Sequence, residues 1–201
     1  MRREVDRLDN KTEYRKIVLD SVETRALEDN GMVISGYITK FNTISQFMGF
    51  YETVAQGAFD KTLADGHNIW GLYNHDFDKV LGSTKTGSLQ LEVDNVGLKF
   101  TLTLNSNISY SNDVYQLVKS GEVEGCSFGF ICNSDSWSMQ EDGSDLRTLL
   151  DVTLIEVTIT PIPAYLDSEA NTRSYNLHIN ELEKHKNDEI RKRKLELELE
   201  L

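Results

Sequence analysis

The sequence predicts a mainly β (α+β) fold, an antiparallel β-barrel surrounded by a few helices. Segments in which apolar and polar residues alternate outnumber the segments with a helical period. The predicted strands are not separated by regular crossover helices, which argues against a doubly wound parallel sheet. A chain of 201 residues, 39% of them hydrophobic, is also long enough to bury a core without disulfides or metals.

The first half of the chain contains two clear strands and one short helix. Residues 1–30 form a charged arm, in which the alternation over residues 14–22 permits a strand. Residues 33–41 are rich in β-branched and aromatic side chains and predict a strand. Apolar residues at i, i+4 spacing over residues 52–65, followed by a glycine, predict a short helix. Residues 69–75 predict a buried strand that ends in polar residues.

The second half is again rich in strands. Residues 80–104 predict a hairpin around an Asp-Asn-Val-Gly turn. Residues 109–122 have helical spacing and are closed by a glycine. Residues 125–132 and 149–160 predict strands, and the polar residues 133–144 between them predict a surface loop.

These elements predict one domain over residues 31–166, preceded by the charged arm 1–30 and followed by a charged extension over residues 167–201. The end of the extension alternates leucine and glutamate. This period suits a strand, whereas both residue types favour a helix by propensity.

Composition excludes several classes of protein. A formal net charge of −12 is unsuited to binding nucleic acid, which requires a basic surface. No apolar run reaches the roughly 18 residues of a membrane span, and no secretory signal is recognisable at the N-terminus. The two cysteines, Cys126 and Cys132, lie too far apart on one predicted strand to form a disulfide, so we expect a reducing cytoplasm.

The strand over residues 125–132 carries a candidate nucleophile. Alternation places Cys126 with two phenylalanines on the apolar face, and Ser127 with Gly129 on the other face. A serine beside a glycine leaves room for another backbone, as attack on a peptide requires, and makes Gly129 a candidate substrate-binding position. A small polar pair facing outward on an ordinary strand explains the same residues. Cys126 is the weaker candidate nucleophile, because its face is that of the core.

A serine nucleophile needs a base, and the chain has four histidines. His178 and His185 lie in the charged extension, and His67 lies in a turn. His75 ends a buried strand, where the core can hold it while it still faces solvent or substrate. An inert surface histidine at a strand end explains this position as well. A metal site around His75 would need further ligands that the chain does not supply, so we expect no metal and no cofactor.

A third catalytic residue would be a carboxylate that orients the imidazole. Glu156 interrupts an apolar strand, and strict alternation assigns Ile155 to the core face and Glu156, with Leu154, to the opposite face. An outward charge on a half-exposed strand is an equally good explanation of Glu156. Three other carboxylates compete for the role: Asp76, Asp78 and Asp151.

The order of motifs along the chain is more specific than any single motif. In this order they resemble the prohead proteases of HK97-like tailed phages, over roughly residues 30–170. The motifs are Gly-Tyr-Ile-Thr-Lys-Phe at 36–41, Glu-Thr-Val-Ala-Gln-Gly-Ala-Phe at 52–59, Asn-His-Asp at 74–76, Leu-Gly at 81–82, Asn-Val-Gly-Leu at 95–98, Gly-Cys-Ser-Phe-Gly-Phe at 125–130, Leu-Ile-Glu-Val-Thr at 154–158 and Pro-Ile-Pro-Ala-Tyr at 161–165.

This resemblance implies a serine endopeptidase with Ser127 as nucleophile, His75 as general base and Glu156 as the residue that orients His75. The family is similar to the herpesvirus assembly proteases, which implies a β-barrel wrapped by helices and, at the level of fold only, a homodimer. Thr158 stands where a serine is commoner in the family. Arg147 is a candidate to assist at the oxyanion, with nothing in the sequence to single it out.

The resemblance also implies partners and a location. The substrates would be the scaffolding segment of the major capsid protein and the chain itself, cleaved inside the prohead in the host bacterial cytoplasm, with no nucleic-acid or membrane partner. Residues 167–201 would then be a packaging or self-removed extension. Two rival functions are a non-catalytic β-barrel that serves in capsid or scaffold assembly, and a binding module that uses the Trp70 and Tyr73 face. The presence of both His75 and Ser127 argues against the first of them.

Overall fold

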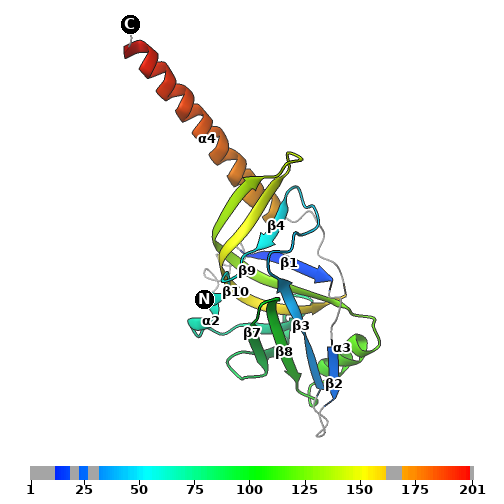
Figure 1. The fold of residues 1–201 in the computed structure, drawn as a ribbon. Coiled ribbons are helices and arrows are strands. Elements are labelled where there is room, and N and C mark those ends of the chain that lie inside the picture. Colours follow the sequence, from blue (N-terminus) through cyan, green and yellow to red (C-terminus); the bar gives the residue numbers. More distant parts are fainter. Residues whose placement is uncertain (1–11, 19–22, 27–31, 162–168, 200–201) are drawn as a thin grey trace.

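The computed structural model describes residues 12–18, 23–26, 32–161 and 169–199, and this part of the chain is mainly β (Figure 1). Its helices are α2 (Asp60–Ala64), α3 (Ser109–Lys119) and α4 (Glu169–Leu199). Its strands are β1 (Glu13–Val18), β2 (Glu23–Ala26), β3 (Met32–Lys40), β4 (Tyr51–Val54), β5 (Trp70–Tyr73), β6 (Asp76–Ser83), β7 (Leu89–Val93), β8 (Gly97–Leu104), β9 (Gly125–Met139) and β10 (Asp145–Thr160).

The described strands form two hydrogen-bonded sheets instead of the closed antiparallel barrel that the sequence predicts. One sheet has the order β1-β9-β10-β5-β6, with β4 also paired to β10, and the other has the order β2-β3-β8-β7. Both β4 and β5 run parallel to β10. The reason is the length of β10: one edge pairs with β9, and the opposite edge takes two short strands, one after the other. The mainly β class is confirmed.

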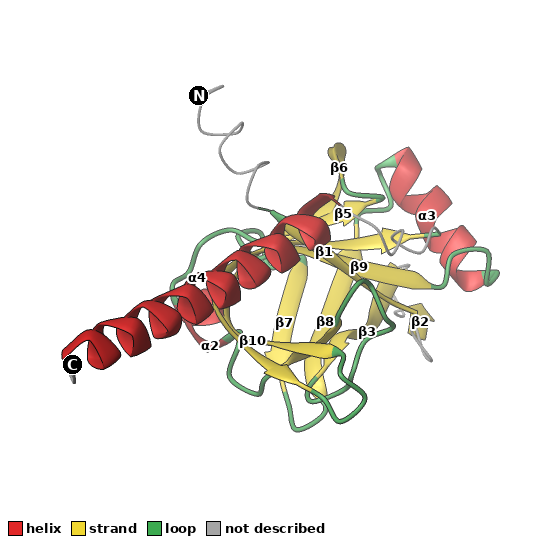
Figure 2. Ribbon diagram, turned by 90° about the horizontal axis from the view of Figure 1, so that it is seen from above, coloured by secondary structure: helices red, strands yellow, loops and turns green. Residues whose placement is uncertain are grey.

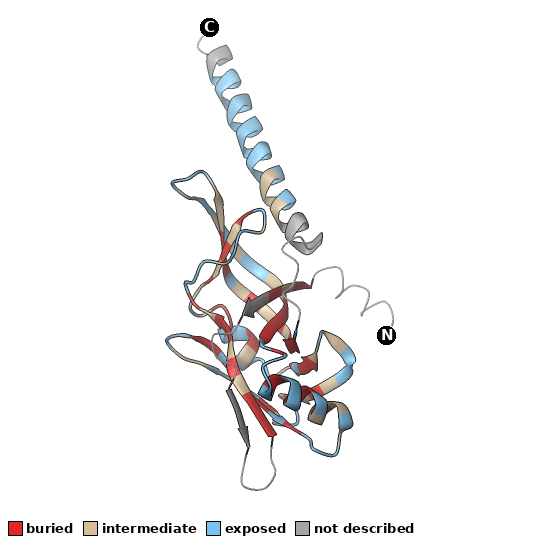
Figure 3. Cartoon of the chain, turned by 90° about the vertical axis from the view of Figure 1, so that its right-hand side faces the viewer, coloured by how far each residue is buried: buried red, intermediate tan, exposed pale blue. Residues whose placement is uncertain are grey.

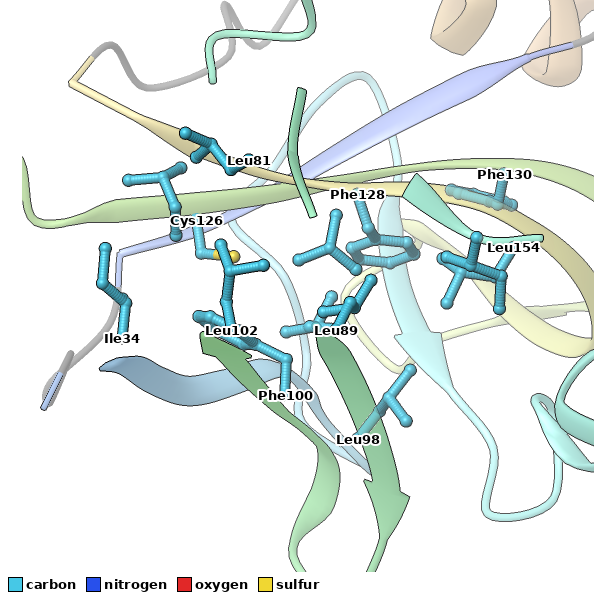
Figure 4. Close-up of a cluster of buried hydrophobic side chains, with 14 of the residues drawn as sticks. Ile34, Leu81, Leu89, Leu98, Phe100, Leu102, Cys126, Phe128, Phe130 and Leu154 are labelled. Carbon is cyan, nitrogen blue, oxygen red and sulfur yellow. The ribbon is translucent and has the colours of Figure 1, made fainter. Parts of the chain in front are cut away.

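The two sheets share one hydrophobic core (Figure 4). Phe128 and Phe130 of β9 are fully buried, in the same cluster as Phe100 and Leu102 of β8 from the other sheet. Each such side chain contributes roughly 1.5–3 kcal/mol when it leaves water. The predicted alternation along β9 is therefore confirmed on its apolar side.

The helix predicted over residues 52–65 is wrong in its first half. Residues 51–54 form the strand β4, and only residues 60–64 are helical. Glu52 is buried and its carboxylate binds two arginines, a long-range contact that local periodicity does not reveal. Gly57 then adopts a φ of +92°, a left-handed conformation that ends the extended segment and keeps a helix from starting earlier.

The loop predicted over residues 133–144 is also shorter than expected. β9 continues to Met139 and pairs with β10 over its whole length, so the turn is confined to residues 140–144. Trp137 stabilises this polar end, because its ring packs against Phe50 with the centroids 5.0 Å apart.

Helix α4 projects away from the two sheets (Figures 1 and 2). Near its start, Tyr175 stacks on Phe50 at 5.8 Å and His178 stacks on Trp137 at 4.2 Å. Beyond these contacts its described side chains are mostly exposed, whereas buried residues concentrate in the β body (Figure 3). None of the described helices combines the length and the apolar character needed to cross a membrane.

Candidate active site

His75 lies in the tight turn between β5 and β6. Tyr73 and Asp76 pair across the hairpin, and the two residues between them, Asn74 and His75, have φ of 54° and 59°. Two successive residues with positive φ form a type I′ turn, which favours asparagine first and glycine second. Histidine in the second position costs roughly 1–3 kcal/mol of backbone strain, the kind of cost that proteins retain at functional sites.

Strand β10 holds this turn through three hydrogen bonds. The Asn74 backbone N–H donates to the Ile159 carbonyl at 2.9 Å, and the His75 backbone N–H donates to Thr158 Oγ1 at 2.9 Å. Thr160 Oγ1 donates to Asn74 Oδ1 at 3.0 Å. The imidazole of His75 is thereby fixed against the second half of β10, although 81 residues separate it from Glu156.

His75 is hydrogen-bonded to a buried carboxylate. Its Nδ1 lies 2.7 Å from Oε1 of Glu156, a residue that is 1% exposed. Burial raises the pKa of Glu156 above its ordinary value, and the hydrogen bond and charge of His75 oppose this rise only in part. An ionised Glu156 accepts the Nδ1 proton, which leaves the Nε2 lone pair of His75 available to take a proton.

A β-bulge directs Glu156 to this site. Leu154 pairs with Phe130 and Glu156 pairs with Gly129, so Ile155 is an extra residue in β10. Leu154 is fully buried and points into the core, whereas Ile155 is only half-buried. The prediction that Ile155 faces the core and Leu154 faces away is therefore wrong, because the bulge reverses the alternation. Without the bulge, the register that buries Leu154 would turn Glu156 into the core as well.

Gly129 makes room for this carboxylate. A Cβ atom at residue 129 would lie 2.7 Å from Oε1 of Glu156 and 2.9 Å from Cε1 of Tyr14. The bare position that the sequence assigns to a substrate backbone thus holds the Glu156 carboxylate and the Tyr14 ring. The ring of Tyr14 in turn packs edge-on against the His75 imidazole at 4.6 Å.

Ser127 lies beside this pair and is fully buried. It is directly opposite Thr158 across the β9–β10 ladder, so the two side chains share the face that also carries Glu156. Thr158 is the residue that accepts the His75 backbone N–H. Ser127 Oγ donates to the main-chain oxygen of Arg15 in β1 at 3.0 Å. The fold therefore brings Ser127, His75 and Glu156 to one face, with β1 lying over the serine.

The other histidines and the competing carboxylates have different contacts. Both ring nitrogens of His67 are engaged, by Asp65 and by the Leu154 carbonyl, and His178 is stacked on Trp137. The same polar contacts raise the pKa of His67 although its partial burial acts to lower it. Two competing carboxylates are engaged elsewhere: Asp151 pairs with Lys61, and Asp76 accepts the Asp78 backbone N–H.

The cysteines and Arg147 lie away from this face. Cys126 is fully buried in the core, and burial raises the pKa of Cys132 to about 11, so this thiol is protonated at neutral pH. Arg147 binds Glu13, Glu52 and Asp135 in a buried ionic cluster, which occupies its guanidinium. In the residues that the structure describes, no group of three or more His, Cys, Asp or Glu side chains is placed to hold a metal ion.

Comparison with known proteins identifies the family. The family described as caudovirus prohead serine protease matches residues 20–185, which is most of the chain. The chain belongs to the caudovirus prohead serine protease family. The resemblance found in the ordered motifs is confirmed.

Two individual proteins are similar to this prohead protease family member. The prohead protease of Escherichia phage T5 is 27% identical over 108 residues, which are 53% of this chain and 47% of that protein. The chain thus spans about half the length of this curated relative. The bacteriophage T4 capsid assembly protease gp21 has a similar fold, with a TM-score of 0.54 and 10% identity, covering 75% of this chain and 97% of that one.

Two parts of the site, the bulge at Ile155 and the contacts of β1, could not be predicted from the sequence. The bulge at Ile155 leaves no local signal, because only the register with β9 defines an extra residue. Tyr14 and the main chain of Arg15 lie in a segment whose alternation permits a strand, but nothing in that period indicates that the strand covers Ser127. The turn at Asn74 and His75 could have been predicted from the sequence, because an asparagine in a two-residue loop between two strands is a hairpin signal.

Proposed function

We propose that the chain is a serine endopeptidase of phage prohead maturation, in which Ser127 is the nucleophile, His75 the general base and Glu156 the residue that orients His75. The observation that carries this proposal is the hydrogen bond of 2.7 Å between His75 Nδ1 and the buried Glu156, on the face that Ser127 shares. A nucleophile, a base and a group that orients the base are the components that acyl transfer requires.

The reaction would proceed through an acyl-enzyme. His75 Nε2 takes the Ser127 Oγ proton while Oγ bonds to the scissile carbonyl carbon, and the proton then passes to the leaving amine as the C–N bond breaks. Water, deprotonated by the same nitrogen, attacks the ester and regenerates Ser127. Glu156 stabilises the imidazolium formed in each half-reaction. Proton transfer of this kind contributes about 10²–10⁴-fold to the rate. Gly129 would contribute to substrate binding through its main chain alone.

The substrates would be the scaffolding segment of the major capsid protein and the chain itself, cleaved inside the prohead in the host cytoplasm. The names of the relatives support a role in capsid assembly: one is a prohead protease and the other a capsid assembly protease. Helix α4 would be the part of the extension that is packaged or removed. A homodimer, and the absence of nucleic-acid and membrane partners, remain part of the proposal.

Co-expression with the phage's major capsid protein tests this function. We expect wild type to trim the capsid protein, and Ser127→Ala and His75→Ala to leave it intact. Thr158→Ser is a matched control on the same face, since it keeps the hydroxyl that accepts the His75 backbone N–H. Equal trimming by all four chains would overturn the proposal. Normal assembly of untrimmed particles in all four would instead favour the non-catalytic assembly protein.

A further inference from the structure

Strand β1 holds the edge of β9 that a peptide substrate would need. β1 lies alongside β9 (Figure 1). The two strands are antiparallel, with Arg15 opposite Phe128 and Lys16 opposite Ser127. The other edge of β9 is paired with β10 along its length. An extended peptide that adds to β9 beside Ser127 therefore has one edge available, and β1 lies on it.

The contacts of β1 also engage the two proposed catalytic side chains. The Arg15 carbonyl oxygen lies 3.0 Å from Ser127 Oγ and accepts its proton, so the hydroxyl is turned toward β1. The Tyr14 ring packs edge-on against the His75 imidazole, with the centroids 4.6 Å apart. A substrate carbonyl carbon must come to roughly 3–3.5 Å from Oγ before it can be attacked. The Arg15 carbonyl oxygen, at 3.0 Å, already occupies space beside Oγ that a substrate carbonyl would have to enter.

Ion pairs fasten β1 in this position. The Arg15 guanidinium binds the Glu52 carboxylate through two nitrogens, one of them at 2.8 Å, and Arg147 binds Glu13 at 2.6 Å. All four side chains are buried. Burial acts to raise the pKa of Glu13, but the hydrogen bonds and charges of Arg147 and Arg15 outweigh it, so this pKa is lowered. Charged groups regain hydration when they separate, so a strand held by ion pairs can leave at lower cost than one held by a large apolar surface.

We propose that β1 occupies the place of the substrate strand, so that the chain in this conformation is latent and an extended peptide must displace residues Glu13–Val18 to be cleaved. This inference rests on the proposed protease function. It identifies the β9 edge from Gly125 to Phe130 as the docking surface for an extended peptide. The ionic cluster of Glu13, Arg15, Glu52 and Arg147 is the latch that holds β1 there.

A single substitution can lock β1 in place. Ile17 is opposite Cys126, so Ile17→Cys sets two cysteines across an antiparallel pair, whose Cα separation of roughly 4.5–5.5 Å suits a disulfide. The residues of β9 on the Cys126 face point to the core, so the bridge lies on the side away from Ser127 and Glu156. The readout is the rate at which diisopropyl fluorophosphate modifies Ser127 in the full-length chain, with and without reductant.

We expect the oxidised Ile17→Cys chain to resist modification, and the reduced chain to react at the wild-type rate. Wild type, treated with oxidant and reductant in the same way, should be unaffected. Equal rates for the oxidised and reduced variant would overturn the latch and leave the protease function standing. No modification of Ser127 in any form, including a folded Arg15→Gln chain in which the latch is weakened, would overturn the proposed function and the latch with it.

A second variant weakens the ionic cluster that holds β1 on β9. Arg15→Gln removes the cation of β1 that binds Glu52, and Glu52 keeps Arg147 at 3.2 Å as a partner. Loss of a buried ion pair should favour release enough to speed modification of Ser127 about tenfold or more. Lys61→Gln is the matched control, because it removes an equal charge from an exposed pair with Asp151. A folded Arg15→Gln chain that reacts no faster than Lys61→Gln would contradict the proposal.

Discussion

Replacing Gly129 by alanine perturbs the proposed site with a single methyl group. The new Cβ would lie 2.7 Å from Oε1 of Glu156, about 0.7 Å less than the 3.4 Å of an ordinary van der Waals contact. The same oxygen accepts the proton of His75 Nδ1 at 2.7 Å. Glu156 must therefore move by a large fraction of an ångström, and its hydrogen bond to His75 lengthens or breaks.

The size of the effect follows from this displacement. A misplacement of about 1 Å in a catalytic arrangement costs roughly 10²-fold in rate. We therefore expect Gly129→Ala to lower kcat by about 10²-fold, measured as the rate of capsid-protein trimming by purified full-length chain. The loss should fall on kcat more than on KM, because the methyl group displaces the carboxylate that supports the base.

Gly71→Ala is the matched control for damage to the fold. Its Cβ would also be crowded, at 2.9 Å, but by Cδ1 of Leu102, the flexible end of a core side chain. We expect it to lower the melting temperature and to leave kcat near the wild-type value. The reasoning is refuted if Gly129→Ala folds and cleaves like wild type, or if Gly71→Ala loses as much activity as Gly129→Ala.

Three further predictions concern the same region. Glu156→Gln should lower kcat by about 10³–10⁴-fold, because the amide no longer stabilises the imidazolium of His75. Burial raises the folded-state pKa of Glu156 above its ordinary value of 4.5. By linkage, the free energy of unfolding of wild type should therefore fall relative to that of Glu156→Gln as pH rises through the raised pKa. Denaturant melts at a series of pH values would detect this loss. Thr158→Val should reduce kcat by about tenfold or more, because it removes the hydroxyl that accepts the His75 backbone N–H. Thr158→Ser keeps a hydroxyl and should have a kcat near that of wild type. Equal kcat values for the two variants would show that Thr158 does not position His75. Phe128→Ala should destabilise the fold by about 3–5 kcal/mol in urea melts, and a loss below 1 kcal/mol would contradict the buried packing.

Local periodicity was sufficient wherever a strand follows its own alternation. Along β9 it placed Cys126 and Phe128 in the core and Ser127 and Gly129 on the other face, and the cross-strand register agrees. The hairpin of β7 and β8 was predicted for the same reason, since its turn residues and its alternation are adjacent in the chain. Both features depend on neighbours a few residues away.

Features that depend on distant partners were not predictable in this way. The bulge at Ile155 exists only in relation to β9, so counting along β10 assigned Leu154 to the wrong face. Glu52 looked like part of a helix because its burial depends on Arg15 and Arg147, which lie 37 and 95 residues away. Nothing in the sequence of the charged arm indicates that Glu13 and Arg15 are buried in ion pairs.

The ionic cluster also explains why a charged N-terminal segment can join a sheet at all. Glu13 and Arg15 sit on the apolar side of β1, where single charges would be prohibitive. Each is instead paired with a residue of another strand, Arg147 of β10 and Glu52 of β4. The pairing makes β1 specific in register, because a slip of one residue would turn both charges away from their partners.

The most direct test of the central claim is to identify the atom that reacts. Full-length chain is treated with diisopropyl fluorophosphate, digested, and mapped by mass spectrometry. We expect one phosphoryl adduct, on Ser127, and a rate of modification that falls by at least about 10²-fold in His75→Ala. An adduct on another serine, or capsid-protein trimming by a chain in which Ser127 is replaced by alanine, would contradict it.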